Sequence, residues 1–172
     1  YLAGISDFPV LRADGSIWQR PGYDRETCIL YDPPADSPGV AVPETLTQDH
    51  AVDAVATLLE PVCDFPFESD AHRSAWLAAV LTPLARSAFD GPAPLFLVDA
   101  NVRGAGKTLL VQTIGRIVLG RDAPAGGYSS EPIENAKKIT SIAVAGDRLF
   151  LFDNIAGALG DEAIDRALTS TM

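Results

Sequence analysis

The 172-residue sequence has little cysteine, a single methionine, no long apolar run and few basic residues in its first half. Its two cysteines, Cys28 and Cys63, lie far apart and outside any C-x-x-C spacing or Cys/His cluster. This argues against a disulfide framework or a zinc site, and we expect two reduced thiols in a cytoplasmic protein. No run of about 18 apolar residues occurs, so the sequence predicts no membrane span. No signal peptide is visible.

Basic residues are unevenly distributed along the chain. Residues 1–93 hold 14 Asp and Glu against 5 Arg, whereas residues 94–172 hold 9 acidic against 8 basic residues. Nucleic-acid binding usually rests on basic side chains that displace counterions from phosphates. The first half is therefore an unfavourable DNA-binding surface, and any contact with DNA has to be local or come from a further segment.

What remains is the composition of an ordinary globular protein, 47% hydrophobic and 21% charged. Short strand-like runs occur at 10–12, 17–19 and 27–31, and the proline-rich stretch that follows lacks periodicity. We interpret residues 1–44 as a small β-rich segment and a linker. Residues 45–172 are interpreted as the main domain, which we expect to be truncated at its C-terminus because the chain ends soon after a helical pattern.

The main domain alternates helical and strand-like patterns. Helical apolar spacing occurs near 47–60, 70–89, 107–120, 133–145 and 160–169. Apolar runs at 95–98 and 149–152 are typical of strands buried in a parallel sheet, and we interpret 120–132 as a loop. The order strand, loop, helix, helix, strand predicts an α/β fold with a parallel sheet, preceded by helices and the β-rich segment.

Residues 101–108 read Asn-Val-Arg-Gly-Ala-Gly-Lys-Thr between a predicted buried strand and an amphipathic helix, which is the context of a P-loop (Walker A) motif. Glycines let the backbone curl so that successive N–H groups point at phosphate oxygens, and the following helix adds its positive dipole end. Lys107 is placed to reach the β- and γ-phosphates, and the Thr108 hydroxyl to ligate Mg²⁺. The motif predicts bound ATP and Mg²⁺. The predicted nucleotide-binding residues are Asn101, Arg103, Gly104, Ala105, Gly106, Lys107, Thr108 and Leu109.

Asn101 departs from the common pattern, because it replaces the first glycine of the loop. Asparagine tolerates a left-handed backbone better than other non-glycine residues. We therefore expect the loop to form despite the replacement.

The second apolar run ends in Asp153-Asn154, and an apolar strand followed by an acid is the Walker B arrangement. Asp153 falls at the carboxyl end of the strand, where α/β sheets bind ligands, and its expected role is to orient Mg²⁺ through water. Thr108 and Asp153 are the predicted metal-site residues.

Asn154 occupies the position at which many such ATPases carry a glutamate that activates the attacking water. Asparagine cannot act as a base, so either another carboxylate acts, with Glu134 and Glu131 as candidates, or Asn154 only positions the water and turnover is slow. The predicted catalytic residues are Lys107, Asp153, Asn154 and Glu134. Lys137 and Lys138 could meet phosphate or DNA, but a solvated helix face is the default interpretation for both.

Several stretches carry a resemblance to a known family: 94–100, 104–110, 138–141, Gly146-Asp147 and 152–154, with 9–15 and 21–24 ahead of them. Together they resemble the ATPase region of phage and plasmid primase-helicase proteins, which are related to superfamily 3 helicases and AAA+ ATPases. The resemblance covers nearly the whole chain. It is specific for the P-loop class and less so for the replication role.

The resemblance implies a P-loop NTPase core of the AAA+/RecA-like type. It also implies a hexameric homo-oligomeric ring that couples ATP hydrolysis to movement on single-stranded DNA. In such rings a neighbouring subunit donates an arginine finger and a later strand supplies a polar sensor. Arg148 and Arg166 are candidates that we do not assign to either role.

Three functions follow as hypotheses. The first is the ATPase motor of a mobile-element replication protein, a DNA helicase. The second is a nucleotide-binding regulatory or scaffold module with little hydrolysis, motivated by Asn101, Asn154 and the acidic first half. The third, a P-loop enzyme that transfers phosphate to a small molecule, lacks a visible lid or acceptor-binding motif.

Overall fold

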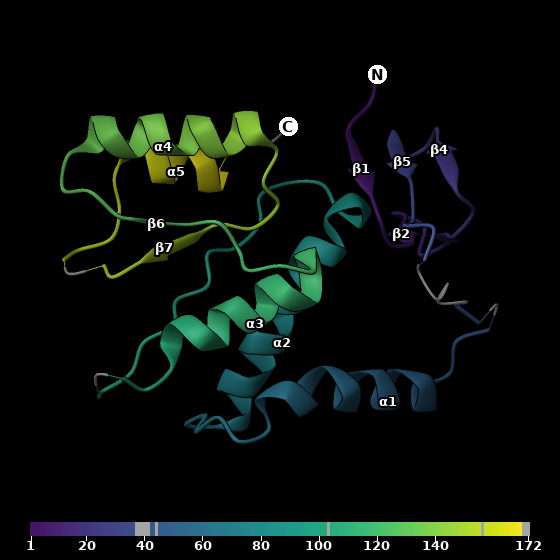
Figure 1. Cartoon of the computed structure of the whole chain (residues 1–172), viewed down its shortest axis with the longest axis horizontal. Helices are drawn as coiled ribbons and strands as arrows, with labels where there is room; N and C mark the ends of the chain where they lie inside the picture. The colour runs from purple at the N-terminus through teal and green to yellow at the C-terminus, as the bar shows by residue number, and fades with distance from the viewer. Residues whose placement is uncertain (37–41, 44, 103, 156, 170–172) are drawn as a thin grey trace. The chain divides into compact units, whose positions relative to one another are not determined.

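The computed structural model describes residues 1–36, 42–43, 45–102, 104–155 and 157–169 (Figure 1). The chain divides into two compact units, the first comprising Tyr1–Glu60 with Leu84–Asp90 and the second Pro61–Pro83 with Gly91–Met172. None of the helices in these described ranges combines the length and apolarity needed to cross a membrane.

Two small sheets form the first unit. In one, β5 (Ile29–Tyr31) lies between β1 (Gly4–Ser6), its parallel neighbour, and β4 (Gly22–Asp24), its antiparallel neighbour. In the other, β2 (Val10–Leu11) pairs antiparallel with β3 (Ile17–Trp18). The predicted β-rich N-terminal segment is confirmed. The sequence interpretation missed β1 and β4, which are three residues long and contain glycine, a residue of low strand propensity.

Asp24, the last residue of β4, is the polar centre of the first unit. Its side chain is 3% exposed. The carboxylate accepts hydrogen bonds from Arg12 Nη2 at 2.5 Å, Arg12 Nε at 3.0 Å and Thr27 Oγ1 at 2.9 Å. The Arg12 guanidinium holds the pKa of Asp24 well below its usual range, with further lowering by Thr27.

Two helical segments accompany the sheets of the first unit. Helix α1 (Gln48–Leu59) begins with a capping box, in which Thr47 Oγ1 accepts from the backbone N–H of His50 and His50 Nδ1 accepts from that of Thr47. The 3₁₀ turn η2 (Arg86–Ala88) is tied to β2, because Ser87 Oγ donates to the Leu11 carbonyl at 2.8 Å.

The second unit contains a two-stranded sheet and the remaining helices. β6 (Ala125–Gly127) pairs parallel with β7 (Leu151–Asp153), so that Gly127 lies opposite Asp153. Helix α4 (Pro132–Ala145) packs against α5 (Glu162–Thr169). Figure 1 shows this helix pair on one side of the strands and α3 (Lys107–Leu119) on the other.

Helix α2 (Asp70–Leu84) ends one residue after Pro83, whereas the sequence analysis extended this helix to 89. Proline lacks the backbone N–H that a helix needs and its ring crowds the preceding turn, so it disfavours further helix at this point. The buried side chains of α3 are Leu110, Ile114 and Val118, at the i, i+4, i+8 spacing that predicted the helix. Its C-terminus is the predicted Gly120, which adopts a left-handed φ of 66°.

The predicted core strand at 95–98 is wrong. This segment has no strand pairing in the structure, and Leu95 and Leu97 are 48% and 76% exposed instead of being buried in a sheet. Pro92 and Pro94 precede the segment and lack the N–H groups that a central strand donates. Apolar content alone was therefore a poor guide to sheet membership here.

The strand that does pair with β7 is β6, which lies inside the predicted loop 120–132. Its sequence Ala-Gly-Gly has low strand propensity, which explains why it was missed. Gly126 suits the position because a Cβ there would lie 3.2 Å from Phe150 Cζ. The fold is thus mixed α/β with small sheets, an N-terminal β segment and, within the described residues, five α-helices. Among the described residues, the parallel pairing of the second unit consists of β6 and β7, and the P-loop core stays a prediction.

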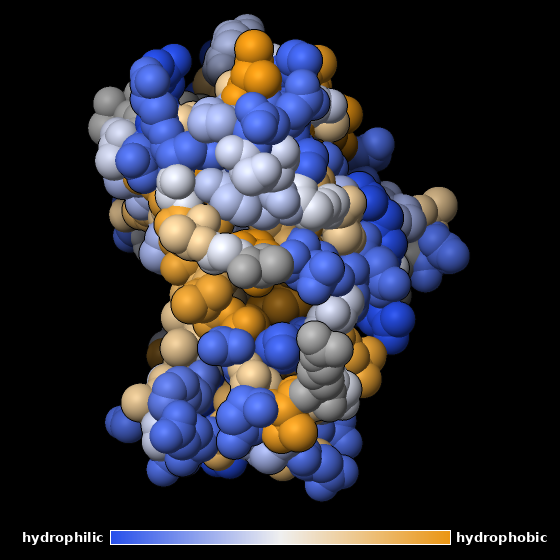
Figure 2. All heavy atoms as spheres, turned by 90° about the vertical axis from the view of Figure 1, so that its left-hand side faces the viewer, coloured by the Kyte–Doolittle hydropathy of each residue, from blue (hydrophilic) through white to orange (hydrophobic). Residues whose placement is uncertain are grey.

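The second unit exposes several large apolar side chains, and Figure 2 shows a face on which hydrophobic residues lie among hydrophilic ones. The most exposed are Leu97, Val102, Leu109, Ile133 and Val144. Most belong to or flank the segments that predicted the nucleotide site.

Candidate nucleotide-binding site

The loop before α3 forms a small concave surface. Gly104 and Gly106 have φ values of 77° and 80°, in the left-handed region that glycine adopts without strain. Consecutive residues 104–109 line a cavity of about 280 Å³. Alternation of left-handed and ordinary backbone turns successive N–H groups toward one concavity, and the N-terminus of α3 adds its positive dipole end. We call this feature the phosphate cradle.

Asn101 does not use the left-handed conformation proposed for it. Among the described residues other than glycine, only Cys28 and Asn154 have positive φ, both 57°. Asn101 therefore begins the loop with an ordinary backbone and an exposed side chain. Arg103, also predicted to bind nucleotide, lies outside the described residues.

Lys107 is the first residue of α3 and is half-buried at the cradle. Its ammonium makes no hydrogen bond or ion pair with any residue of the described part of the chain. An ammonium with no carboxylate partner at a helix N-terminus is a ready donor to an anion. Ala105 and Leu109 complete the lining of the cradle.

Thr108 and Asp153, the two predicted metal-site residues, lie together although 45 residues separate them. Thr108 Oγ1 donates to Asp153 Oδ2 at 3.4 Å. Asp153 ends β7 and is half-buried, and its other oxygen accepts from the backbone N–H of Asn154 at 2.8 Å. Mg²⁺ binds oxygens at about 2.1 Å in octahedral geometry, which places neighbouring ligand oxygens about 3 Å apart. The Thr108–Asp153 pair therefore fits two adjacent positions around such an ion, directly or through one water.

A series of contacts inside the second unit fixes α3 relative to β7. Buried Trp76 of α2 donates its indole N–H to the Leu110 carbonyl in the first turn of α3, at 3.2 Å. The Gln112 side chain accepts from the backbone N–H of Ala123 at 2.7 Å and donates to its carbonyl at 3.3 Å. Gly115 permits this approach, because a Cβ there would lie 2.5 Å from Ala123 N.

The connection continues into the sheet, where Leu151 N–H donates to the Pro124 carbonyl at 2.9 Å. Pro124 directly precedes β6, so this bond adds to the β6–β7 pairing. The position of Asp153 beside Thr108 thus depends on packing that spans α2, α3, β6 and β7.

The candidate water-activating residues are arranged less favourably. Glu134 lies in the first turn of α4, and its carboxylate accepts from Lys137 Nζ at 2.8 Å. This hydrogen bond, followed by the Lys137 charge, lowers the pKa of Glu134 and weakens it as a base. Glu131 serves as the N-cap residue of α4. Asn154 directly follows Asp153 and is exposed, so it can orient a water at the metal-site pair without accepting its proton.

Lys138 is a residue whose position the sequence analysis did not resolve. Its Nζ donates to the carbonyl of Gly127, the register partner of Asp153, and its stem passes 3.7 Å from the Cβ position of Gly126. The ammonium therefore reaches the carboxyl end of the two-stranded sheet. The sequence offered no local signal for this contact, because the Gly127 carbonyl belongs to a different element.

Comparison with protein-family models, curated proteins and solved structures gives no match for this chain. Within the described residues, no three His, Cys, Asp or Glu side chains group as metal ligands. A site that uses one carboxylate and one hydroxyl, with phosphate and water oxygens as the remaining ligands, needs no such group. Function is therefore inferred from the geometry of the cradle and the Thr108–Asp153 pair.

Proposed function

We propose that this chain is the ATP-binding and hydrolysing motor domain of a phage or mobile-element DNA replication protein of the primase-helicase type. The observation that carries the proposal is the 3.4 Å approach of Thr108 Oγ1 to Asp153 Oδ2 beside the phosphate cradle. A glycine-rich loop, a lysine without a partner among the described residues, and a hydroxyl–carboxylate pair are the parts that phosphoryl-transfer sites use to hold a Mg²⁺-nucleotide.

Each residue has a definite part in this proposal. Backbone N–H groups of 104–108 bind the phosphates, and Lys107 donates to the β- and γ-phosphate oxygens. Thr108 and Asp153 hold Mg²⁺, which neutralises charge on the phosphates when it is bound. Asn154 orients the attacking water, and a base supplied from elsewhere removes its proton.

The family resemblance supports the remaining parts of the proposal: a hexameric ring of identical chains and single-stranded DNA as the partner. The second half holds 8 of the 13 Lys and Arg residues of the chain, and contacts with DNA phosphates are expected from this half. The acidic first half has no comparable set.

A second candidate function is a nucleotide-binding regulatory or scaffold module with little hydrolysis. It is favoured by one observation: the Lys137 ammonium binds the Glu134 carboxylate and lowers its pKa, so Glu134 is a weak base. Asn154, the residue next to Asp153, cannot take up a proton in its place. Phosphoryl transfer to water without a nearby base is slow, so this module would bind ATP tightly and turn it over poorly.

The test is a titration of Mg²⁺-ATP into the chain, compared with Lys107→Ala and with Lys137→Ala as the matched lysine control. We expect Lys107→Ala to weaken binding about 100-fold, because it removes a charge-assisted contact to the phosphates, and Lys137→Ala to bind as wild type does. Phosphate release with added single-stranded DNA follows on the same samples. DNA-stimulated release that Lys107→Ala abolishes supports the motor, whereas binding without release supports the regulatory module. A wild-type chain that binds no ATP overturns both.

A further inference from the structure

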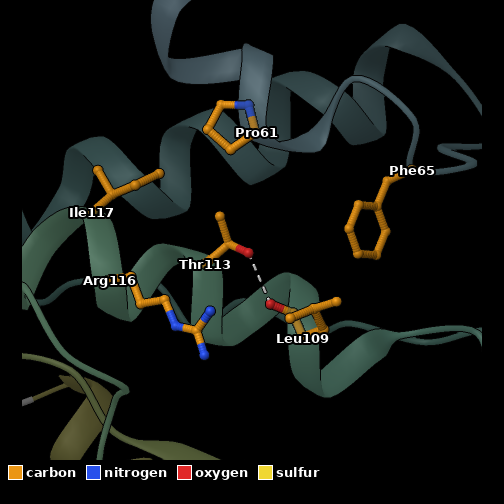
Figure 3. A pocket seen from close by; sticks show the side chains of 6 residues that line it. All are labelled: Pro61, Phe65, Leu109, Thr113, Arg116 and Ile117. Carbon is orange, nitrogen blue, oxygen red and sulfur yellow. Dashed lines mark hydrogen bonds between the residues drawn. The ribbon is translucent and has the colours of Figure 1, made fainter.

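A second cavity, of about 440 Å³, adjoins the phosphate cradle in the second unit. Two sides form it: the outer face of α3 and the segment that leads into α2 (Figure 3). Its lining residues are Pro61, Phe65, Leu109, Thr113, Arg116 and Ile117. We call it the α3 groove. Its volume lies within the range of roughly 300–1,000 Å³ found for small-molecule sites.

The groove and the cradle are neighbouring cavities. Leu109 lines both cavities. The Phe65 ring lies against the last glycine of the cradle, because the Cβ position of Gly106 is 3.2 Å from Phe65 Cε1 and 3.5 Å from its Cζ. From Leu109 to Ile117 the groove follows α3 for about 12 Å, at 1.5 Å per residue. A ligand with phosphates in the cradle therefore has its next open space in the α3 groove.

The lining has the chemistry of a site for a flat heteroaromatic ring. Phe65, Pro61 and Ile117 supply apolar surface, and the half-buried Phe65 presents an aromatic face. Such a face stacks on nucleobases of any kind, because every base has a π-face. An apolar lining gives an inorganic anion no polar contacts, whereas it suits the part of a ligand that extends beyond its phosphates.

Two polar groups of the groove are held in fixed positions. Thr113 Oγ1 donates to the Leu109 carbonyl at 2.9 Å, so its lone pairs remain to accept an N–H from a base edge (Figure 3). Arg116 Nε donates to Asp122 Oδ1 at 2.7 Å, which restrains the guanidinium and leaves further N–H donors free. Of the two, Thr113 is the nearer along α3 to Gly106, against which Phe65 lies, and it offers an acceptor to the edge of a nucleobase.

We propose that the α3 groove binds the base of the nucleoside triphosphate, with Phe65 as the stacking side chain and Thr113 at the base edge. This inference rests on the proposed function, since it extends the same nucleotide from the cradle into the groove. It assigns a binding role to Phe65, which lies 42 residues before Lys107 and belongs to no motif.

The test compares two ligands that share a triphosphate, of which only the first carries a nucleoside: Mg²⁺-ATP and inorganic tripolyphosphate with Mg²⁺. Titration calorimetry is carried out on wild type, Phe65→Ala, Phe65→Leu and, as the matched control, Phe67→Ala. Phe67 is also half-buried, in the same segment, but lines neither cavity. We expect Phe65→Ala to weaken ATP binding about tenfold, in line with stacking losses on alanine substitution, and to leave tripolyphosphate binding unchanged.

Phe65→Leu keeps apolar volume and serves if the alanine variant folds poorly; it should weaken ATP binding several-fold while sparing tripolyphosphate. Equal losses for both ligands would show that Phe65 only shapes the cradle and would overturn the base site, as would ATP binding unaffected by either substitution. If wild type binds tripolyphosphate as tightly as ATP, the base site fails while the cradle stands. If wild type binds neither, the proposed function itself fails.

Discussion

Asp24 and Asp153 each end a three-residue β-strand, one in each unit, yet their surroundings differ sharply. Asp24 is almost fully buried and accepts from Arg12 and Thr27 side chains and from the backbone N–H groups of Glu26 and Thr27. Asp153 is half-buried, and from the described residues it accepts a 3.4 Å hydrogen bond from Thr108 and one from its own neighbour, Asn154. The first carboxylate is saturated by protein donors, whereas the second retains capacity for a cation.

The difference separates a structural acid from a site acid on physical grounds. A buried carboxylate is stable only when the protein supplies its hydrogen bonds, so all of its lone pairs are used internally. A carboxylate that binds a metal has to leave lone pairs unused and stay accessible. Position at a strand end is common to both and does not distinguish them.

The largest expected effect is a loss of folding stability when Asp24, the saturated carboxylate, is replaced. Asp24→Asn removes the charge that pairs with Arg12 and should lower the free energy of unfolding by roughly 3 kcal/mol. Urea denaturation measures this, with exposed Asp36→Asn as the control that should change little. Unchanged ATP binding is expected for both variants. A loss below about 0.5 kcal/mol for Asp24→Asn would show that the network is not structural.

Lowering the pH should reduce the stability that the Asp24 network contributes. Because the folded pKa of Asp24 is lowered, first by the Arg12 hydrogen bond, its contribution is fully present above the unfolded pKa of about 3.9. That contribution decreases as the pH falls from there toward the folded pKa. Between pH 4 and pH 3 the stability gap between wild type and Asp24→Asn should narrow, by roughly 1 kcal/mol. A gap that stays constant in urea denaturation over this range would contradict the assignment.

For the unsaturated acid the expected effect is on ligand binding. Asp153→Asn should weaken Mg²⁺-dependent ATP binding about tenfold, because it removes a charged oxygen ligand, and should leave ATP binding without Mg²⁺ unchanged. Calorimetric titrations at high and zero Mg²⁺ separate the two. The unfolding free energy should stay within about 0.5 kcal/mol of wild type. A large loss of stability would instead show that Asp153 is a structural acid, as Asp24 is.

Asp161 is a third case beside Asp24 and Asp153, because its carboxylate is saturated with hydrogen bonds yet lies inside the second unit. It accepts from the backbone N–H groups of Ala163 and Ile164, from Asn135 Nδ2 at 2.7 Å and from Tyr128 at 3.1 Å. These bonds, led by that of Ile164, lower its pKa. Asp161→Ala should lower the thermal midpoint by about 3 °C, through loss of the cap of α5. In the same scanning experiment Asp153→Asn should shift it less; the reverse order would contradict the distinction.

Sequence reasoning located most helices, because their information is local. Helix α3 shows both signals, with apolar residues at four-residue spacing from Leu110 and a glycine stop at Gly120. Strand pairing was a different matter. The apolar run 95–98 was chosen over Ala125–Gly127, although only the latter pairs with β7. A strand is stabilised by its neighbours, so its membership in a sheet is not encoded in its own residues.

The sequence by itself identified the residue types of the candidate site: a glycine-rich loop, Lys107 with Thr108, and an acid after an apolar run. These are local features, since each depends on residues that are adjacent in the chain. Three contacts were decided only by the tertiary structure. Thr108 Oγ1 lies 3.4 Å from Asp153 Oδ2, Lys137 donates a hydrogen bond to Glu134, and Phe65 lies against Gly106. Contacts between distant segments depend on how helices and strands pack together, and packing is set by the whole unit rather than by any one motif.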